Sequence, residues 1–168
     1  MVGCCVNTLV VSGNTIYVGG GFTSVGGEPR VNLAAIHRDS GLATGWNPGA
    51  NSYVMSLGVS GNTVYVGGAF TSIGGVARTN IAAVDASTGN VTGWNPNPNS
   101  SNVLAVEVSG STVYAGGLFT SIGGQPRSKL AALDAATGLA TSWNPGVDGF
   151  GWQVFDIEVS GGRVYVGG

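Results

Sequence analysis

The chain has 168 residues, of which 8% are charged and 43% are hydrophobic, and its net charge is −2. Lys129 is the single lysine, so no basic stripe is available to pair with phosphates, and we expect no nucleic-acid partner. The mean hydropathy is +0.27, yet no apolar run approaches the roughly 18 residues that a spanning helix needs. We therefore expect buried β-strands and no membrane insertion.

The first residues, Met1 to Cys5, have neither the basic nor the apolar region of a secretory signal. Cys4 and Cys5 are the only cysteines. A disulfide between neighbours is strained, because bridged Cα atoms usually lie about 4.4–6.8 Å apart and consecutive ones about 3.8 Å apart. We expect two small apolar residues at the start of a strand. Pairing with another chain or with a missing segment is the alternative.

A unit of about 50 residues repeats along the chain, which is the period of a supersecondary unit. Near copies begin at Val11, Val59, Val108 and Val159, at spacings of 48, 49 and 51 residues. The units are approximately 1–48, 49–97, 98–146 and a short 147–168, within a single domain. Because the last copy stops inside the motif, we expect a fragment of a longer protein.

The second unit shows the predicted elements most clearly. Two strands cover Val54 to Val59 and Thr63 to Gly67, and the Ser-Gly-Asn turn between them is typical of a hairpin. A glycine-flanked loop follows, and a third strand covers Asn80 to Val84. Asp85 caps the next turn, and a fourth strand covers Val91 to Trp94 before a proline ends it.

Four antiparallel strands in each unit, without a helical period, are typical of a β-propeller blade. The sequence therefore predicts an all-β fold, a propeller of about three and a half four-stranded blades. A parallel β-helix is the alternative, but its coils are shorter and have fewer hairpin turns. A closed ring normally needs about 4 to 8 blades. Since open sheet edges with little charge invite pairing, we expect missing blades or another chain to complete the ring.

The segments VYVGGAFTSIGG, AAVDASTG and GWNP resemble the bacterial β-propeller repeat of unknown function sometimes called the delta-60 repeat, over nearly the whole chain. The unit is more loosely similar to the tryptophan-docking repeat of pyrroloquinoline-quinone propellers. Ala83, Asp85, Thr88, Gly89 and Trp94 match that pattern, although the Gly-to-Trp spacing is one residue longer. The resemblance implies how blades dock. It implies no quinone chemistry, because the cofactor and metal residues have no counterpart here.

Several residues recur at fixed places in the units. We expect the tryptophans to be buried between blades, and the arginines to hydrogen-bond loop carbonyls or the Asp-capped turns of a neighbouring blade. Asp85 and Asp134 stand at a turn position where the first unit has His37, so this position acts as a cap and not as a catalytic base. The recurring tryptophans and arginines are Trp46, Trp94, Trp143, Arg30, Arg78 and Arg127.

Two features break the repeat. Asp156 and Glu158 lie two apart on one predicted strand, hence on one face, and Glu107 aligns with Glu158 in the previous unit. Their oxygens form a candidate calcium site, with a solvated channel wall as the alternative. The loop that accounts for the longest spacing contains Phe150 and Trp152, which are candidate ligand-binding residues. Packing against the next blade is the alternative for these two aromatic residues.

No nucleophile motif stands beside His37, the only histidine, and phosphate loops and histidine–cysteine metal spacings are absent. The function we predict is a non-catalytic extracellular interaction or adhesion module without cofactors, whose stiff blades present loops to a protein or glycan partner. Two alternatives stay open: a structural subunit of an extracellular filament, sheath or surface layer formed by self-association, and the substrate-binding propeller of a larger secreted enzyme. The presented loops are Gly49 to Tyr53, Asn97 to Asn102 and Gly146 to Trp152.

Overall fold

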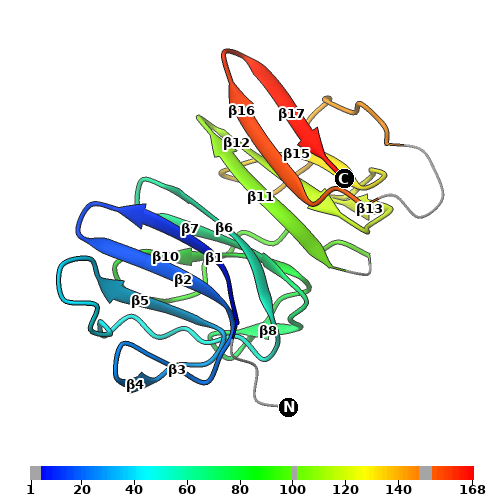
Figure 1. Cartoon of the computed structure of the whole chain (residues 1–168). Coiled ribbons are helices and arrows are strands. Elements are labelled where there is room, and N and C mark those ends of the chain that lie inside the picture. The colour runs from blue at the N-terminus through cyan, green and yellow to red at the C-terminus, as the bar shows by residue number, and fades with distance from the viewer. Residues whose placement is uncertain (1–4, 100–101, 148–152) are drawn as a thin grey trace.

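The structure, a computed structural model, describes residues 5–99, 102–147 and 153–168. Each of the first three units forms one three-stranded antiparallel sheet, and the fourth unit forms a two-stranded one. The sheets follow one another from unit 1 to unit 4 (Figure 1). In the described residues no helix is long and apolar enough to cross a membrane. The all-β fold built of small antiparallel sheets is confirmed, while closure into a propeller ring stays a prediction.

The main sheets share one strand order, in which the second strand of a unit lies between the first and the third. They contain β1 (Cys5–Ser12), β2 (Thr15–Gly21) and β5 (Leu33–His37) in unit 1, β6 (Val54–Ser60), β7 (Thr63–Gly68) and β10 (Ile81–Asp85) in unit 2, β11 (Val103–Ser109), β12 (Thr112–Gly117) and β15 (Leu130–Asp134) in unit 3, and β16 (Asp156–Ser160) and β17 (Arg163–Gly167) in unit 4.

The glycine-flanked loop of each complete unit is itself a small hairpin, which the sequence did not predict. In unit 2, Ser72 pairs with Ala77 and Ile73 with Val76. Gly74 and Gly75 have φ values of 56° and 75°, the left-handed pair that a tight hairpin turn requires. These hairpins are β3 (Ser24–Val25) with β4 (Glu28–Pro29), β8 (Ser72–Ile73) with β9 (Val76–Ala77), and β13 (Ser121–Ile122) with β14 (Gln125–Pro126).

The predicted fourth strand of each unit is reduced to one bridge, so the four-stranded blade is corrected to three strands and a short tail. In unit 2 that bridge joins Val84 and Val91. Pairing ends there because the Trp94 amide turns back to donate to Thr92 Oγ1 at 3.2 Å. The indole of Trp94 then reaches the next unit, where its Nε1 donates to the Asp134 carbonyl at 3.1 Å. The tail therefore docks units together and does not extend its own sheet.

Neighbouring sheets pack through their first strands, since β6 packs against β1 and β11, and β11 packs against β16. The recurring Gly-Gly pair makes this close approach possible. A Cβ on Gly67 would lie 2.8 Å from Val106 Cγ2 of the next unit, and a Cβ on Gly68 would overlap the Tyr53 carbonyl of its own unit. The first glycine of the pair thus admits the next sheet, and the second admits the strand beside it.

A tyrosine and a tryptophan fasten one unit to the next at two junctions. Tyr17 and Trp46 meet edge to face with centroids 5.0 Å apart, and Trp46 is 6% exposed. The Tyr17 hydroxyl donates to the Ala86 carbonyl at 3.0 Å, and Trp46 Nε1 donates to the Asp85 carbonyl at 2.9 Å. Tyr65 and Trp94 repeat the arrangement against unit 3. Burial of these two tryptophans between units is confirmed, whereas Trp143 is half-buried.

Candidate functional site

The recurring aspartates are turn caps, as predicted. Oδ1 of Asp85 accepts hydrogen bonds from the Ser87 and Thr88 hydroxyls at 2.7 and 2.9 Å, and from the Thr88 amide at 2.7 Å. These bonds, the one from Ser87 foremost, lower the pKa of Asp85 to about 2. Asp134 forms the same turn, and its pKa is lowered chiefly by the Thr137 hydroxyl. A carboxylate held in its charged form by its own turn is not a proton acceptor for catalysis.

The recurring arginines bond loop carbonyls within their own unit. Arg78 donates to the Ala77 carbonyl at 2.9 Å through Nη1 and to the Thr92 carbonyl at 2.8 Å through Nη2. The prediction of loop carbonyls is confirmed, but the Asp-capped turn of a neighbour is not their partner. Each arginine joins the end of the small hairpin to the tail of its own unit. Arg30 and Arg127 form the equivalent pairs.

The linkers that enter units 2 and 3 are each fixed by an asparagine. Oδ1 of Asn51 accepts from the Thr71 and Ser72 amides at 2.9 and 3.0 Å, and its amide donates to Thr71 Oγ1 at 2.8 Å. Asn99 makes the same three bonds to Thr120 and Ser121. Two of the loops predicted to be presented, Gly49 to Tyr53 and Asn97 to Asn102, are therefore anchored at one residue to the small hairpin of the unit that follows.

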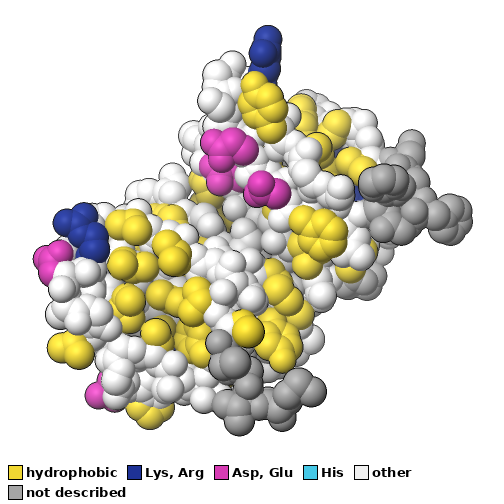
Figure 2. All heavy atoms as spheres, in the orientation of Figure 1, with side chains coloured by type: hydrophobic (Ala, Val, Ile, Leu, Met, Phe, Trp, Pro, Cys, Tyr) yellow, Lys and Arg dark blue, Asp and Glu magenta, His cyan; other side chains and the backbone are white. Residues whose placement is uncertain are grey.

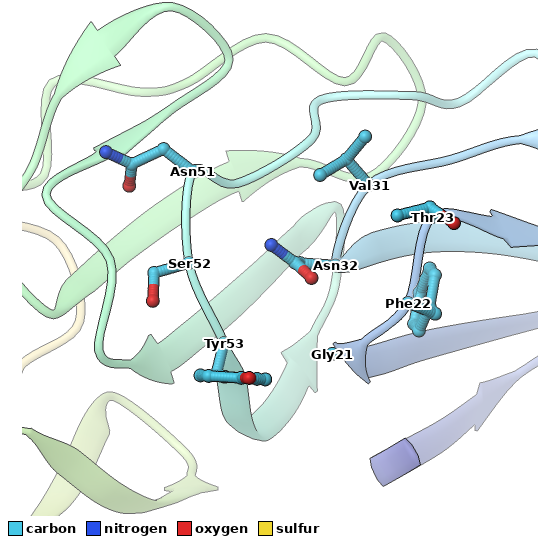
Figure 3. A pocket seen from close by; sticks show the side chains of 8 residues that line it. All are labelled: Gly21, Phe22, Thr23, Val31, Asn32, Asn51, Ser52 and Tyr53. Carbon is cyan, nitrogen blue, oxygen red and sulfur yellow. The ribbon is translucent and has the colours of Figure 1, made fainter. Parts of the chain in front are cut away.

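The linker before β6 and unit 1 line an open pocket with a volume of about 270 Å³ (Figure 3). Its walls come from three segments, the end of β2, the turn before β5 and the linker. None of the lining residues carries a charge. They are Gly21, Phe22, Thr23, Val31, Asn32, Asn51, Ser52 and Tyr53.

The pocket depends on two residues that depart from the repeat. Gly21 stands where units 2 and 3 have Ala69 and Leu118, and a Cβ at Gly21 would overlap the Tyr53 ring. Tyr53 in turn stands where unit 3 has Asn102. The Tyr53 ring can lie against Gly21 only because that position has no side chain, and 49% of Tyr53 is exposed.

Asn32 is one of two asparagines in the pocket whose side chains are held by hydrogen bonds, the other being Asn51. It has a φ of 61°, a left-handed conformation that asparagine tolerates better than most residues. Its amide reaches from unit 1 toward the linker (Figure 3) and donates to the Ala50 carbonyl at 2.9 Å. The hydroxyls of Thr23, Ser52 and Tyr53 make no hydrogen bond within residues 5–99, 102–147 and 153–168. The pocket therefore combines two oriented amides, free hydroxyls and an aromatic face.

The candidate calcium carboxylates come near one another where units 3 and 4 meet, but they do not form a cation site. Burial, and then the charges of Glu158 and Asp156, raise the pKa of Glu107. Among the described residues, no group of three or more His, Cys, Asp or Glu side chains is arranged to hold a metal ion.

Other predicted residues lie outside the described part of the chain or in exposed positions. Phe150, Trp152 and Cys4 fall outside the described residues, so the aromatic loop stays a prediction. Cys5 is an exposed free cysteine at the start of β1, in agreement with the expected strand start. His37 is exposed at the end of β5.

The outer face of unit 1 is a surface that sequence reasoning did not single out. Val6 and Leu9 on β1 are 55% and 61% exposed, whereas their equivalents in unit 2, Val54 and Leu57, are 0% and 7% exposed. Val11 is 51% exposed on the same strand. Hydrophobic side chains gather over the sheet of unit 1 (Figure 2). In units 2 and 3 this face is covered by the preceding unit, and we call it the open face of unit 1.

Solved structures resemble this chain in fold. The likeness concerns the fold alone, because sequence identity is low. The crystal structure of the computationally designed Ika4 protein matches with a TM-score of 0.67 and 17% identity, over 97% of this chain and 84% of that one. The computationally designed Ika8 protein matches with a TM-score of 0.53 and 16% identity, over 94% of this chain and 54% of Ika8. No family model and no curated protein matches the sequence.

Proposed function

We propose that the chain is part of a β-propeller and serves as a non-catalytic interaction module outside the cell, binding a protein or glycan through loops held between blades. The observation that carries this proposal is the linker before β6. One residue of it, Asn51, is fixed by three hydrogen bonds, and the next two, Ser52 and Tyr53, line a pocket. A loop ordered before binding loses little conformational entropy when a partner is bound.

The propeller part of the proposal is supported by the way the units follow one another. The first strands of successive units are neighbours, and hydrogen bonds connect them directly. Asn7 Nδ2 donates to the Val54 carbonyl at 2.9 Å, and the Val106 amide donates to Ser56 Oγ at 2.9 Å. The Tyr–Trp contact recurs with the same geometry at two junctions. A constant junction between antiparallel sheets, with first strands innermost, is what a ring of blades requires.

The interaction proposal is tested with the intact chain on arrays of extracellular polysaccharides and matrix proteins. We expect at least one partner to bind, and Asn51→Ala to weaken that binding because the linker loses its anchor. Asn47→Ala is the matched control, since Asn47 is an exposed asparagine outside the pocket. Failure to bind any glycan or protein on the arrays would reject the proposal, and so would equal effects of the two substitutions.

A structural role by self-association is the second candidate, and the open face of unit 1 favours it. The face has the form of the faces that units 2 and 3 bury, so a repeat unit from another copy fits it. The predicted result is an oligomer in sedimentation experiments that Leu9→Lys dissociates. Leu139→Lys is the matched control, because Leu139 is equally exposed at 61% but lies outside the strands, beyond the turn that follows β15. A chain that stays monomeric at every concentration excludes this candidate.

A further inference from the structure

We propose that the pocket between unit 1 and the linker before β6 binds one residue of a neutral saccharide, with the Tyr53 ring as its stacking platform. This inference rests on the proposed interaction function and names the site and the ligand class. It differs from the sequence prediction, which placed ligand contacts at Phe150 and Trp152.

Tyr53 gives the pocket an aromatic face. The Tyr53 ring is held against the backbone at Gly21, where no side chain intervenes, and about half of the residue remains exposed at 49%. An aromatic face carries negative potential and attracts the weakly positive C–H groups that cover one face of a sugar ring. An exposed, positioned tyrosine is therefore suited to a ligand whose surface is partly apolar and partly hydroxylated.

The polar lining of the pocket is uncharged. It contains amides and hydroxyls but no carboxylate, ammonium or guanidinium group. Asn32 is oriented by its bond to the Ala50 carbonyl, which leaves its Oδ1 as an acceptor. Thr23 and Ser52 have hydroxyls that make no hydrogen bond in the described part of the chain, and each is both a donor and an acceptor. Such a set matches sugar hydroxyls and offers nothing to neutralise an ionic ligand.

The size of the pocket suits a single sugar residue. The volume of about 270 Å³ lies just below the roughly 300 Å³ at which pockets for drug-sized ligands begin. One monosaccharide residue fits this scale, and a longer chain would extend from the pocket over the exposed Val31 side chain, which is 47% exposed. A weak, millimolar affinity is expected for a single sugar, because the site is shallow and its contacts are few.

The test uses ¹H–¹⁵N spectra of the intact chain titrated with neutral hexoses, N-acetylhexosamines and their short oligomers. We expect the amides of residues 21–23, 31–32 and 51–53 to shift together. Tyr53→Ala should weaken binding roughly tenfold, since one stacked aromatic contact is worth up to about that factor. Tyr165→Ala is the matched control, because Tyr165 is 52% exposed on β17 and does not line the pocket.

A second variant keeps the test independent of the loss of an aromatic side chain. Thr23→Val retains the size of the side chain and removes one free hydroxyl, so it should weaken binding without changing the spectrum of the rest of the chain.

The outcomes separate this inference from the function on which it rests. Saccharide shifts confined to other residues would overturn the pocket and leave the interaction module intact. No shift with any neutral sugar, or shifts with anionic sugars alone, would overturn the inference, while the arrays decide the interaction function separately. Retention of affinity by Tyr53→Ala would also overturn it.

Discussion

Replacing Trp94 by phenylalanine tests whether the Tyr–Trp contact fastens the units. The substitution removes the 3.1 Å hydrogen bond from Nε1 to the Asp134 carbonyl, a net loss of about 1 kcal/mol. The loss stays near that value because the same carbonyl still accepts from the Gly138 amide at 2.9 Å. The smaller ring leaves roughly 40 Å² of apolar surface unburied, which costs about 1 kcal/mol more at ~25 cal/mol per Å². The expected loss of unfolding free energy is therefore about 2 kcal/mol.

Urea denaturation followed by circular dichroism measures this loss, and a fall in melting temperature of about 4–8 °C should accompany it for a chain of this length. Trp46→Phe should match Trp94→Phe, because Trp46 makes the same bond and is equally buried. Trp143→Phe is the control. Trp143 is half-buried, and its indole donates to no acceptor within the described residues. Equal losses at Trp94 and Trp143, or a loss below about 0.5 kcal/mol at Trp94, would refute the reasoning.

Three further predictions concern charge and space. Burial raises the pKa of Glu107 above 4.5, so the carboxyl favours the folded state below that pH, and this contribution is lost as pH rises through the folded pKa. Glu107→Gln should therefore raise the melting temperature at pH 7 and leave it unchanged near pH 4. A lower melting temperature at pH 7 would contradict this prediction. The pKa of Asp85 is lowered to about 2, so the contribution of this carboxylate to stability is present above pH 3.8, its ordinary pKa, and is lost as pH falls through about 2. Asp85→Ala should therefore lower the melting temperature at pH 7 but not near pH 2. His37→Ala, at the equivalent turn of unit 1, should change the melting temperature little at either pH. Gly67→Ala should lower the unfolding free energy in urea by roughly 1–3 kcal/mol, because its Cβ would lie 2.8 Å from Val106 Cγ2. Gly93→Ala, whose Cβ would have no atom within 4 Å, should be neutral or slightly stabilising. Similar effects of the two substitutions would show that a side chain at Gly67 is accommodated without strain.

The sequence predicted the parts of each unit that depend on short-range chemistry. The hairpin of β6 and β7 follows from alternating β-branched residues around Ser60-Gly61-Asn62, and the cap at Asp85 follows from an Asp two and three residues before hydroxyl side chains. Both were found within one or two residues of the predicted bounds. Burial of Trp94 was also predictable, because a large apolar ring that recurs in each unit has few other places to go.

The errors arose where one chain segment had two possible partners. Val91 to Trp94 has the composition of a strand, but Trp94 gains more by docking on unit 3 than by extending its own sheet. Arg78 bonds Thr92 in its own unit, and nothing in the spacing of the two residues distinguishes that carbonyl from one in the next unit. Composition describes what a segment is able to do, and only the packing of whole units decides between the alternatives.

The candidate pocket had a signal in the sequence, and it lies in the departures from the repeat. The residues that dock one unit on the next, such as Tyr17 and Trp46, recur because the docking geometry recurs, and their side chains are already engaged in those contacts. Asn99 is the counterpart of Asn51, because each of the two anchors a linker. The residues beside the anchor face solvent and are free to differ, as Tyr53 does from Asn102. Differences between units therefore indicate candidate ligand sites, and a repeat of this kind can present a different site at each junction while the same Tyr–Trp contacts hold the first two junctions.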